Sequence, residues 1–213
     1  MREKILVGFI ILMSINLYAQ VAVPENSPDE WILAFVDVET TGLKPGYHEI
    51  IDFGVVLSDL NGAELDRLFV RIMPQFPERA SQGAIEVNSF SKKRWAQLET
   101  LSPVAAVDSI VQFHKRIADG RKILMVAFNS QFDTAFIDHL FRSVDQSWRE
   151  LYYYYVLDIP SMAWANGIRS LHGQKLSKYF SIPDEPHTPE EHTGITGADL
   201  NYRLYKEIIQ QSD

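Results

Sequence analysis

The chain contains no cysteine among its 213 residues, so it cannot form a disulfide bond or a thiolate metal site. Any metal it binds has to be held by oxygen and nitrogen ligands, and hard oxygen ligands suit Mg²⁺ or Mn²⁺. The lack of cysteine does not decide the compartment, because proteins without disulfides also occur in oxidising spaces.

Basic residues are also scarce, since 20 Lys and Arg stand against 28 Asp and Glu and the formal net charge is −8. A protein that holds nucleic acid by charge alone normally needs a basic surface, and this composition does not provide one. Nucleic acid is not excluded, because acids that bind divalent cations at a site also count against the net charge. No internal repeat or low-complexity segment is present, and the length suits one α/β domain.

The first twenty residues differ in composition from the rest. Arg2 and Lys4 precede an apolar run over residues 5–15, and Ala19 lies at a position suited to cleavage. This pattern predicts a signal peptide over residues 1–20 and a periplasmic or secreted protein, with no stable membrane insertion after cleavage. A membrane anchor is the rival, but the run is shorter than the ~20 residues that span a bilayer. A mis-assigned start codon is the third alternative, and a cytoplasmic protein remains the alternative location.

Residues 21–30 contain Pro24 and Pro28 among polar residues and are predicted to be a linker. The domain is predicted over residues 31–213, with a mixed five-stranded sheet flanked by helices. The expected strands cover residues 31–38, 50–60, 63–72, 123–128 and 152–157, and the expected helices follow Ser102-Pro103, Asn129 and Thr196. Asn61-Gly62 indicates a tight hairpin between the second and third strands. For the tyrosine run 152–155, core packing is favoured over a surface that stacks bases.

Two carboxylates lie at the end of the first predicted strand. Asp37 and Glu39 follow the apolar run that begins at Trp31, and residues i and i+2 of a strand share a face. Like charges so close together are costly unless a cation lies between them. The pair therefore indicates a metal site, and an exposed strand end is the alternative.

Further candidate residues come from two later segments. Asp133 lies in the first turn of the helix after the strand 123–128, where an acid is also favoured by the helix dipole alone. His192 and Asp199 lie in the segment that leads into the last helix. An imidazole beside acids suits the activation of water for hydrolysis, although a lone histidine in a loop is usually only solvated.

These segments together resemble the DEDDh 3′-to-5′ exonucleases of the RNase H-like superfamily, which include the DNA polymerase III proofreading subunit, RNase T and oligoribonuclease. The resemblance runs from about Trp31 to Ile209 and is strongest over Asp37-Val38-Glu39-Thr40-Thr41-Gly42-Leu43. The segment from Asn129 to Asp133 resembles the second motif. Val156-Leu157-Asp158-Ile159 resembles a strand that often carries an aspartate, and we expect Asp158 to be structural or to support the site residues, with no metal role.

The resemblance implies roles for individual residues. It implies two divalent ions, Mg²⁺ or Mn²⁺, held by Asp37, Glu39 and Asp133, with His192 as the base that takes a proton from the attacking water. It also implies that Thr40, Thr41 and Leu43 contact the terminal nucleotide, with Asn129 and Phe132 as further contacts. His187 is a less favoured alternative base.

The third motif departs from the pattern of the family. A metal-binding Asp is expected five residues after His192, but that position is Gly197, and Asp199 comes two residues later. A regular helix would turn Asp199 away by about 200°. If Thr196 is the N-cap and Gly197 begins the first turn, a longer loop could return Asp199 to the site. We expect Asp199 to be the fourth metal ligand.

The sequence therefore predicts a metal-dependent 3′-to-5′ exonuclease that acts on single-stranded DNA or RNA ends and releases nucleoside monophosphates. The alternatives are a catalytically impaired module that binds nucleic acid or protein, favoured by Gly197, and a phosphodiesterase for short oligonucleotides, favoured by the low basic charge. The sequence does not distinguish DNA from RNA and predicts no oligomeric state.

Overall fold

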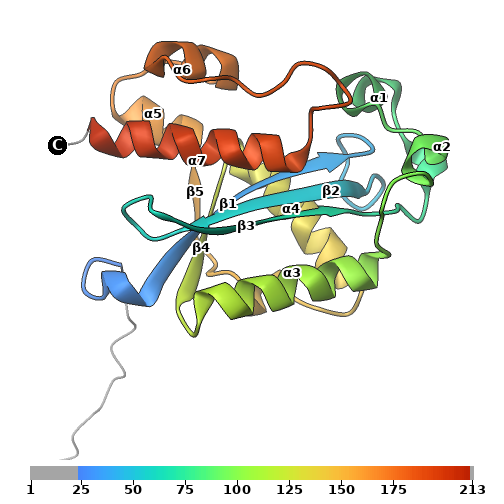
Figure 1. Ribbon diagram of the computed structural model, residues 1–213, viewed down its shortest axis with the longest axis horizontal. Helices are drawn as coiled ribbons and strands as arrows, with labels where there is room; N and C mark the ends of the chain where they lie inside the picture. The colour runs from blue at the N-terminus through green and yellow to red at the C-terminus, as the bar shows by residue number, and fades with distance from the viewer. Residues whose placement is uncertain (1–23, 212–213) are drawn as a thin grey trace, which may run out of the picture.

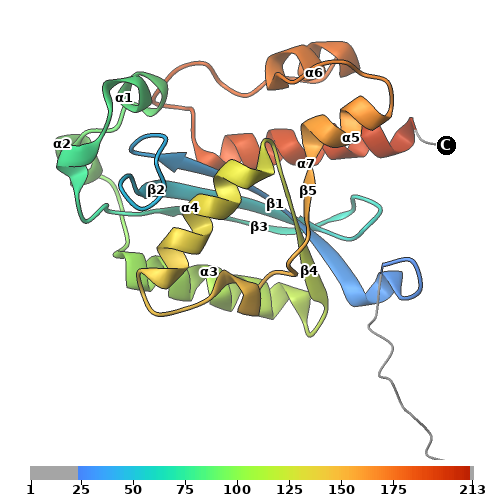
Figure 2. The ribbon, with the colours of Figure 1, turned by 180° about the vertical axis from the view of Figure 1, so that it is seen from behind.

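The computed structural model describes residues 24–211 (Figures 1 and 2). The predicted signal peptide, residues 1–20, lies outside the described residues. The helices and strands are η1 (Pro28–Glu30), β1 (Trp31–Thr40), β2 (Ile50–Ser58), β3 (Glu64–Arg71), η2 (Pro77–Arg79), α1 (Gln82–Asn88), α2 (Lys92–Trp95), α3 (Pro103–Ala118), β4 (Lys122–Ala127), α4 (Ser130–Arg142), η3 (Trp148–Glu150), β5 (Val156–Asp158), α5 (Ile159–Ala165), α6 (Gly173–Phe180) and α7 (Gly194–Gln210). None of the helices in this part of the chain is both long and apolar enough to cross a membrane.

The strands form one five-stranded sheet in the order β3-β2-β1-β4-β5. β1 pairs antiparallel with β2 and parallel with β4, and β5 is parallel to β4. The expected mixed sheet is therefore confirmed. The hairpin at Asn61-Gly62 is confirmed as well: Gly62 has φ +82°, in the left-handed region, and the Asp59 side chain accepts hydrogen bonds from the backbone N–H groups of Asn61 and Ala63.

Helices cover both faces of the sheet, and β1 contributes to both cores because its side chains alternate. Ile32, Ala34 and Val36 pack with α3 and α4, whereas Trp31, Leu33 and Phe35 pack with α5 and α7. Figure 1 shows α7 over one face of the sheet and α3 under the other. The even spread of apolar residues along β1 follows from this double burial, and it leaves Asp37 and Glu39 on the side of the strand that carries α7.

The prediction for the tyrosine run is only partly correct. Tyr152 is buried, and its hydroxyl lies 2.8 Å from His114 Nε2, but it is not part of a strand. Tyr154 and Tyr155 are exposed, and their ring centroids are 4.0 Å apart. The edge strand β5 pairs with β4 only from Val156 onward, so the tyrosines precede the hydrogen-bonded ladder.

The strand β2 closely approaches the start of α7. A Cβ added to Gly54 would lie 2.2 Å from the backbone of Gly194 and Ile195, well inside van der Waals contact. The glycine thus allows the two backbones to touch. This contact fixes the height of α7 above β1 and β2.

Substitution Gly54→Ala is expected to lower the free energy of unfolding by about 1–3 kcal/mol, because the helix has to move or the strand has to distort. Gly83→Ala is the matched control, since nothing lies within 4 Å of its added Cβ and the residue lies in α1. The control is expected to gain about 0.5–1 kcal/mol from helix propensity. Urea unfolding monitored by circular dichroism measures both values, and equal effects of the two variants would contradict the close contact.

Candidate active site

The site begins at the end of β1, where the strand lies beside β2. Asp37 is paired with Gly54 and Glu39 with Asp52. Asp37 and Glu39 are two residues apart in the strand and share one face of it, as predicted, and this face lies under the start of α7. The small residue opposite Asp37 leaves room for the helix above it.

Asp133 brings the third carboxylate from the first turn of α4, as predicted. Its side chain is buried and accepts hydrogen bonds from the backbone N–H groups of Val38 and of Asp133 itself. Burial raises the pKa of Asp133 well above its usual value, these backbone bonds oppose the shift, and the charge of Glu39 adds to it. The bond to Val38 ties the start of α4 to the end of β1.

The three carboxylates repel one another in a region with little water. The pKa of Asp37 is raised well above its usual value, first by burial and then by the charges of Asp133 and Glu39. A cation would relieve this repulsion, since it favours the ionised form of every acid around it. The electrostatics of the cluster therefore match a site for a divalent cation.

Glu39 is held by two partners. One carboxylate oxygen lies 3.1 Å from His192 Nε2, and the other accepts a hydrogen bond of 3.1 Å from Asn88 Nδ2. The hydrogen bond to Glu39 raises the pKa of His192 to about 9, so the imidazole is protonated at neutral pH in this arrangement. On the other side of the ring, Nδ1 lies 3.2 Å from the Pro186 carbonyl oxygen. The structure thus brings His192 to the acids, as predicted.

Three residues of the site were missed from the sequence. Asn88 is buried and also donates to the Thr40 carbonyl oxygen, but no motif marks it. Asp52 is buried and accepts a hydrogen bond of 2.7 Å from the Gly194 N–H, and burial followed by the charge of Glu39 raises its pKa to about 7. A lone acid in the apolar run of β2 was the available signal for Asp52. Glu185 Oε2 lies 3.7 Å from His192 Nδ1 in a loop without a recognisable pattern.

The start of α7 differs from the prediction. The helix begins at Gly194 with Thr193 as its N-cap, not at Gly197 after Thr196. Thr193 and Thr196 form a capping box, in which each side chain bonds to the backbone of the other, and this fixes the first turn. The longer loop that would have returned Asp199 to the site is therefore not formed.

The prediction that Asp199 is the fourth metal ligand is wrong, because α7 begins at Gly194. Asp199 faces away from the cluster and pairs with Arg67 Nη1 at 3.3 Å and with Arg203 Nε at 2.9 Å. Gly197 is the residue of α7 that faces the acids, because a Cβ added there would lie 2.4 Å from Asp37 Oδ2. The carboxylate of Asp37 thus packs against the Cα of Gly197, at the position where the family pattern places the fourth acid.

Asp37, Glu39 and Asp133 are the three carboxylates that could hold a cation here. Within residues 24–211, no three acidic or histidine side chains are already arranged as a ligand set. His192 and Asn88 contact the two carboxylate oxygens of Glu39. The chemistry of the three carboxylates fits a hard divalent cation, once Glu39 is released from His192.

A pocket of about 420 Å³ opens beside Glu39. Its lining includes Thr40, Leu43 and Phe132, which were predicted to contact a nucleotide, and its surface is mostly apolar. Leu43 is 79% exposed at this pocket. We call it the Leu43 pocket. Its size and apolar lining suit a small ligand such as a nucleobase with its sugar.

The remaining residues singled out from the sequence lie outside the Leu43 pocket and the carboxylate cluster. Thr41 and Asn129 are not in the lining of the Leu43 pocket. Thr41 is buried, and its hydroxyl oxygen accepts a hydrogen bond from the Glu49 N–H, whereas Asn129 is exposed with φ 59°. His187 pairs with Asp184 at 3.2 Å, away from Glu39. Asp158 accepts hydrogen bonds from the N–H groups of Ser130 and Ser161, which confirms its structural role.

Comparison with known proteins supports the resemblance seen in the sequence. No model of a known protein family matches the chain. The 3′-5′ DNA exonuclease Cap18 of Escherichia coli is 26% identical over 191 residues, which cover 87% of this chain and 95% of Cap18. The match therefore extends over almost the whole of that protein.

Solved structures share the fold at low sequence identity. Escherichia coli exonuclease I in complex with a dT13 oligonucleotide superposes with a TM-score of 0.70 and 12% identity, over 85% of this chain and 41% of exonuclease I. The nuclease domain of 3′hExo, a DEDDh family member bound to rAMP, gives a TM-score of 0.65 and 14% identity, over 84% of this chain and 92% of that domain. The chain thus spans less than half of exonuclease I. The predicted resemblance to 3′-to-5′ exonucleases is confirmed, and the chain shares its fold with exonuclease I and with the 3′hExo nuclease domain.

A fourth acid placed at the glycine of α7 tests the geometry of the cluster. Gly197→Asp is expected to be less stable than the unsubstituted chain without metal by about 1–3 kcal/mol, because it crowds Asp37 and adds a like charge. Saturating Mn²⁺ is expected to raise its Tm by more than it raises that of the unsubstituted chain, since the variant offers one more ligand.

Gly197→Asn is the matched control, with nearly the same size and no charge. Thermal unfolding with and without Mn²⁺ measures all three proteins. An equal Mn²⁺ shift in Gly197→Asp and Gly197→Asn would show that position 197 does not face the metal site.

Proposed function

We propose that this protein is a 3′-to-5′ exonuclease that removes nucleoside monophosphates from single-stranded nucleic acid with the help of Mg²⁺ or Mn²⁺. The observation that carries the proposal is the meeting of Asp37, Glu39, Asp133 and His192 beside the Leu43 pocket. These side chains come from β1, α4 and the loop before α7, which are far apart in the sequence. DNA is the favoured substrate, since Cap18 is a DNA exonuclease and exonuclease I has been crystallised with a DNA oligonucleotide.

Asp37, Glu39 and Asp133 are the residues that would hold the divalent cation. A bound cation supplies positive charge to the scissile phosphate and so favours the build-up of negative charge during hydrolysis. Mg²⁺ and Mn²⁺ are proposed because all three ligands are hard carboxylate oxygens. With glycine at position 197, the chain offers three carboxylates where the family pattern has four.

His192 is proposed as the general base that accepts a proton from the attacking water. A base has to be neutral, and the contact with Glu39 keeps the imidazole protonated at neutral pH. Breaking its hydrogen bond to Glu39 would lower the pKa of His192 and favour the neutral imidazole that a base requires. The Pro186 carbonyl oxygen at 3.2 Å from Nδ1 would then keep the proton on Nδ1 and leave Nε2 free to accept one.

The Leu43 pocket is proposed to hold the terminal nucleotide. Leu43 and Phe132 offer apolar surface to the base, and Glu39 lines the same pocket on the side of the acids. The pocket is bounded by α1, since Ala84, Val87 and Asn88 also line it. A nucleotide held there would have its phosphate next to the carboxylate cluster.

A binding module without catalysis is the second candidate function. It is favoured by the glycine at position 197 and by the pairing of Glu39 with His192, which together leave the ligand set incomplete as placed. A phosphodiesterase for short oligonucleotides is a third alternative, supported by the net charge of −8. Export to the periplasm or the medium is also proposed, on the basis of residues 1–20 alone.

Degradation of 5′-labelled single-stranded DNA and RNA oligonucleotides in Mg²⁺ or Mn²⁺ tests the proposed activity. A ladder that shortens from the 3′ end is expected. Asp37→Asn is expected to abolish it, and His192→Ala is expected to lower the rate by about 10²- to 10⁴-fold, because each removes a group that acts on the reacting phosphate or water.

Asp199→Asn is the matched control, because it also removes one aspartate near the start of α7 but from outside the cluster. It is expected to keep the activity of the unsubstituted chain within about threefold, which corresponds to less than 1 kcal/mol. Absence of cleavage in both metals would overturn the exonuclease and favour the binding module. Cleavage confined to di- and trinucleotides would favour the third alternative.

A further inference from the structure

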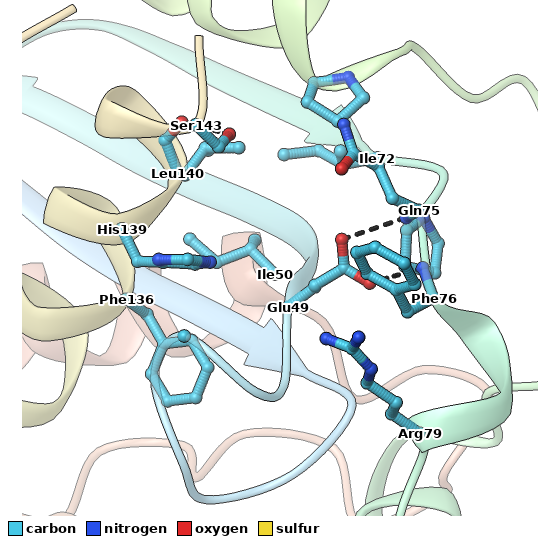
Figure 3. A pocket seen from close by; sticks show the side chains of 13 residues that line it. Glu49, Ile50, Ile72, Gln75, Phe76, Arg79, Phe136, His139, Leu140 and Ser143 are labelled. Carbon is cyan, nitrogen blue, oxygen red and sulfur yellow. Dashed lines mark hydrogen bonds between the residues drawn. The ribbon is translucent and has the colours of Figure 1, made fainter. Parts of the chain in front are cut away.

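A second pocket lies on the other side of the loop that follows β1. Figure 3 shows it between the segment 74–79 and the helix α4, with Ile50 and Ile72 among its lining residues. Its volume is about 160 Å³. On one wall are Phe76 and Arg79, and on the other are α4 side chains that include Phe136 and His139. We call it the Arg79 pocket.

Arg79 is a fixed positive charge at this pocket. Its guanidinium carbon lies 3.7 Å from the centroid of the Phe76 ring and 5.1 Å from that of Tyr47. One guanidinium N–H group of Arg79 donates a long hydrogen bond, 3.4 Å, to the Tyr47 carbonyl oxygen. Within the described part of the chain, Arg79 forms no ion pair. Tyr47 and Phe76 are 53% and 40% exposed, so both rings offer surface to a ligand.

Glu49, the acid among the residues that line the Arg79 pocket, is hydrogen-bonded to the backbone and does not pair with Arg79. Glu49 accepts hydrogen bonds of 2.9 and 2.7 Å from the backbone N–H groups of Gln75 and Phe76, shown as dashed lines in Figure 3. These bonds anchor the segment that carries Phe76 and Arg79 to the start of β2. The aromatic and cationic groups are therefore held in place by the fold and do not depend on a flexible loop.

The Arg79 pocket and the Leu43 pocket are lined by residues of the same loop and of the same helix. Leu43 lines one, and Gly46 and Glu49 of the same loop line the other. On α4, Phe132 lines the Leu43 pocket and Phe136 lines the Arg79 pocket, and their ring centroids are 4.8 Å apart. A strand whose last nucleotide lies in the Leu43 pocket can therefore continue over the loop 41–49 to Arg79.

We propose that Arg79, Phe76 and Tyr47 form a second subsite that binds single-stranded nucleic acid upstream of the scissile bond. The guanidinium pairs with a backbone phosphate, and the exposed rings stack on a base. This combination of a cation and aromatic faces tolerates any sequence, because every phosphate carries charge and every base has a flat face. The inference rests on the proposed function, and it explains how a chain with a net charge of −8 gains affinity for a polyanion at one face.

The test compares a dinucleotide with an octanucleotide, both of thymidine and labelled with 5′-fluorescein. Fluorescence anisotropy gives Kd in buffer with Ca²⁺, and the intactness of each oligonucleotide is checked after the titration. The unsubstituted chain is expected to bind the octanucleotide more tightly than the dinucleotide. Arg79→Gln is expected to weaken octanucleotide binding by about tenfold and to leave dinucleotide binding unchanged.

Arg169→Gln is the matched control, since Arg169 also stacks on an exposed aromatic ring, with its guanidinium carbon 4.6 Å from the Trp164 centroid. It follows α5, which lies on the opposite side of the molecule from α1 (Figure 1), and α1 begins three residues after Arg79 in the chain. This variant is expected to bind both oligonucleotides like the unsubstituted chain. The dependence of Kd on salt gives a second readout, whose slope is expected to fall by about 0.7 in Arg79→Gln alone.

The outcomes separate the two proposals. Octanucleotide binding that is unchanged in Arg79→Gln, or lost equally in Arg169→Gln, would overturn the second subsite and leave the exonuclease intact. Failure of the unsubstituted chain to bind either oligonucleotide would overturn the proposed function and the subsite with it.

Discussion

The contact between the first turn of α7 and the strands β1 and β2 brings α7 and the loop before it to the carboxylates of β1. Gly54 and Gly194 let the two backbones touch, and Asp52 accepts the N–H of Gly194. Further along α7, Asn201 donates to the Val36 carbonyl oxygen at 3.0 Å. Because α7 lies so close to the sheet, Gly197 contacts Asp37. For the same reason His192, which comes just before the helix, lies within 3.1 Å of Glu39. A helix placed farther from the sheet would separate the imidazole from the acids.

The same contact concentrates acidic groups in a place where they are costly. Burial and mutual repulsion raise the pKa of Asp37, Asp52 and Asp133. His192 and Asn88 offset part of this repulsion by bonding to Glu39. The buried carboxylates therefore repel one another, and a bound divalent cation would reduce this repulsion. Because it would bind only the folded protein, the cation would also stabilise the fold. Natural sites often give up stability in this way for function.

Much of the framework could be predicted because the signals are local. The apolar run before Asp37 marks β1, Asn61-Gly62 marks the hairpin, and Ser102-Pro103 marks the start of α3. The alternation of a strand was enough to place Asp37 and Glu39 on one face. Asp133 followed from its position in the first turn of a helix with an apolar stripe.

The predictions that failed depend on geometry between distant segments. The direction of Asp199 is set by a capping box that starts α7 at Gly194, and a shift of three residues in this start decides which residue faces Asp37. Asn88 and Glu39 are 49 residues apart in the sequence, and no local pattern predicts a contact between them. The tyrosines before β5 resemble a strand in composition, but the ladder with β4 begins only at Val156.

Asp37, Glu39 and Asp133 are proposed to hold a divalent cation even with glycine at position 197. Isothermal titration of Mn²⁺ into the unsubstituted chain and into Asp133→Asn tests it directly, because the substitution keeps the size of the side chain and removes its charge. The account predicts saturable binding to the unsubstituted chain and loss of that binding in a variant that is still folded by circular dichroism. Equal binding to both proteins, or none to the unsubstituted chain, would contradict it.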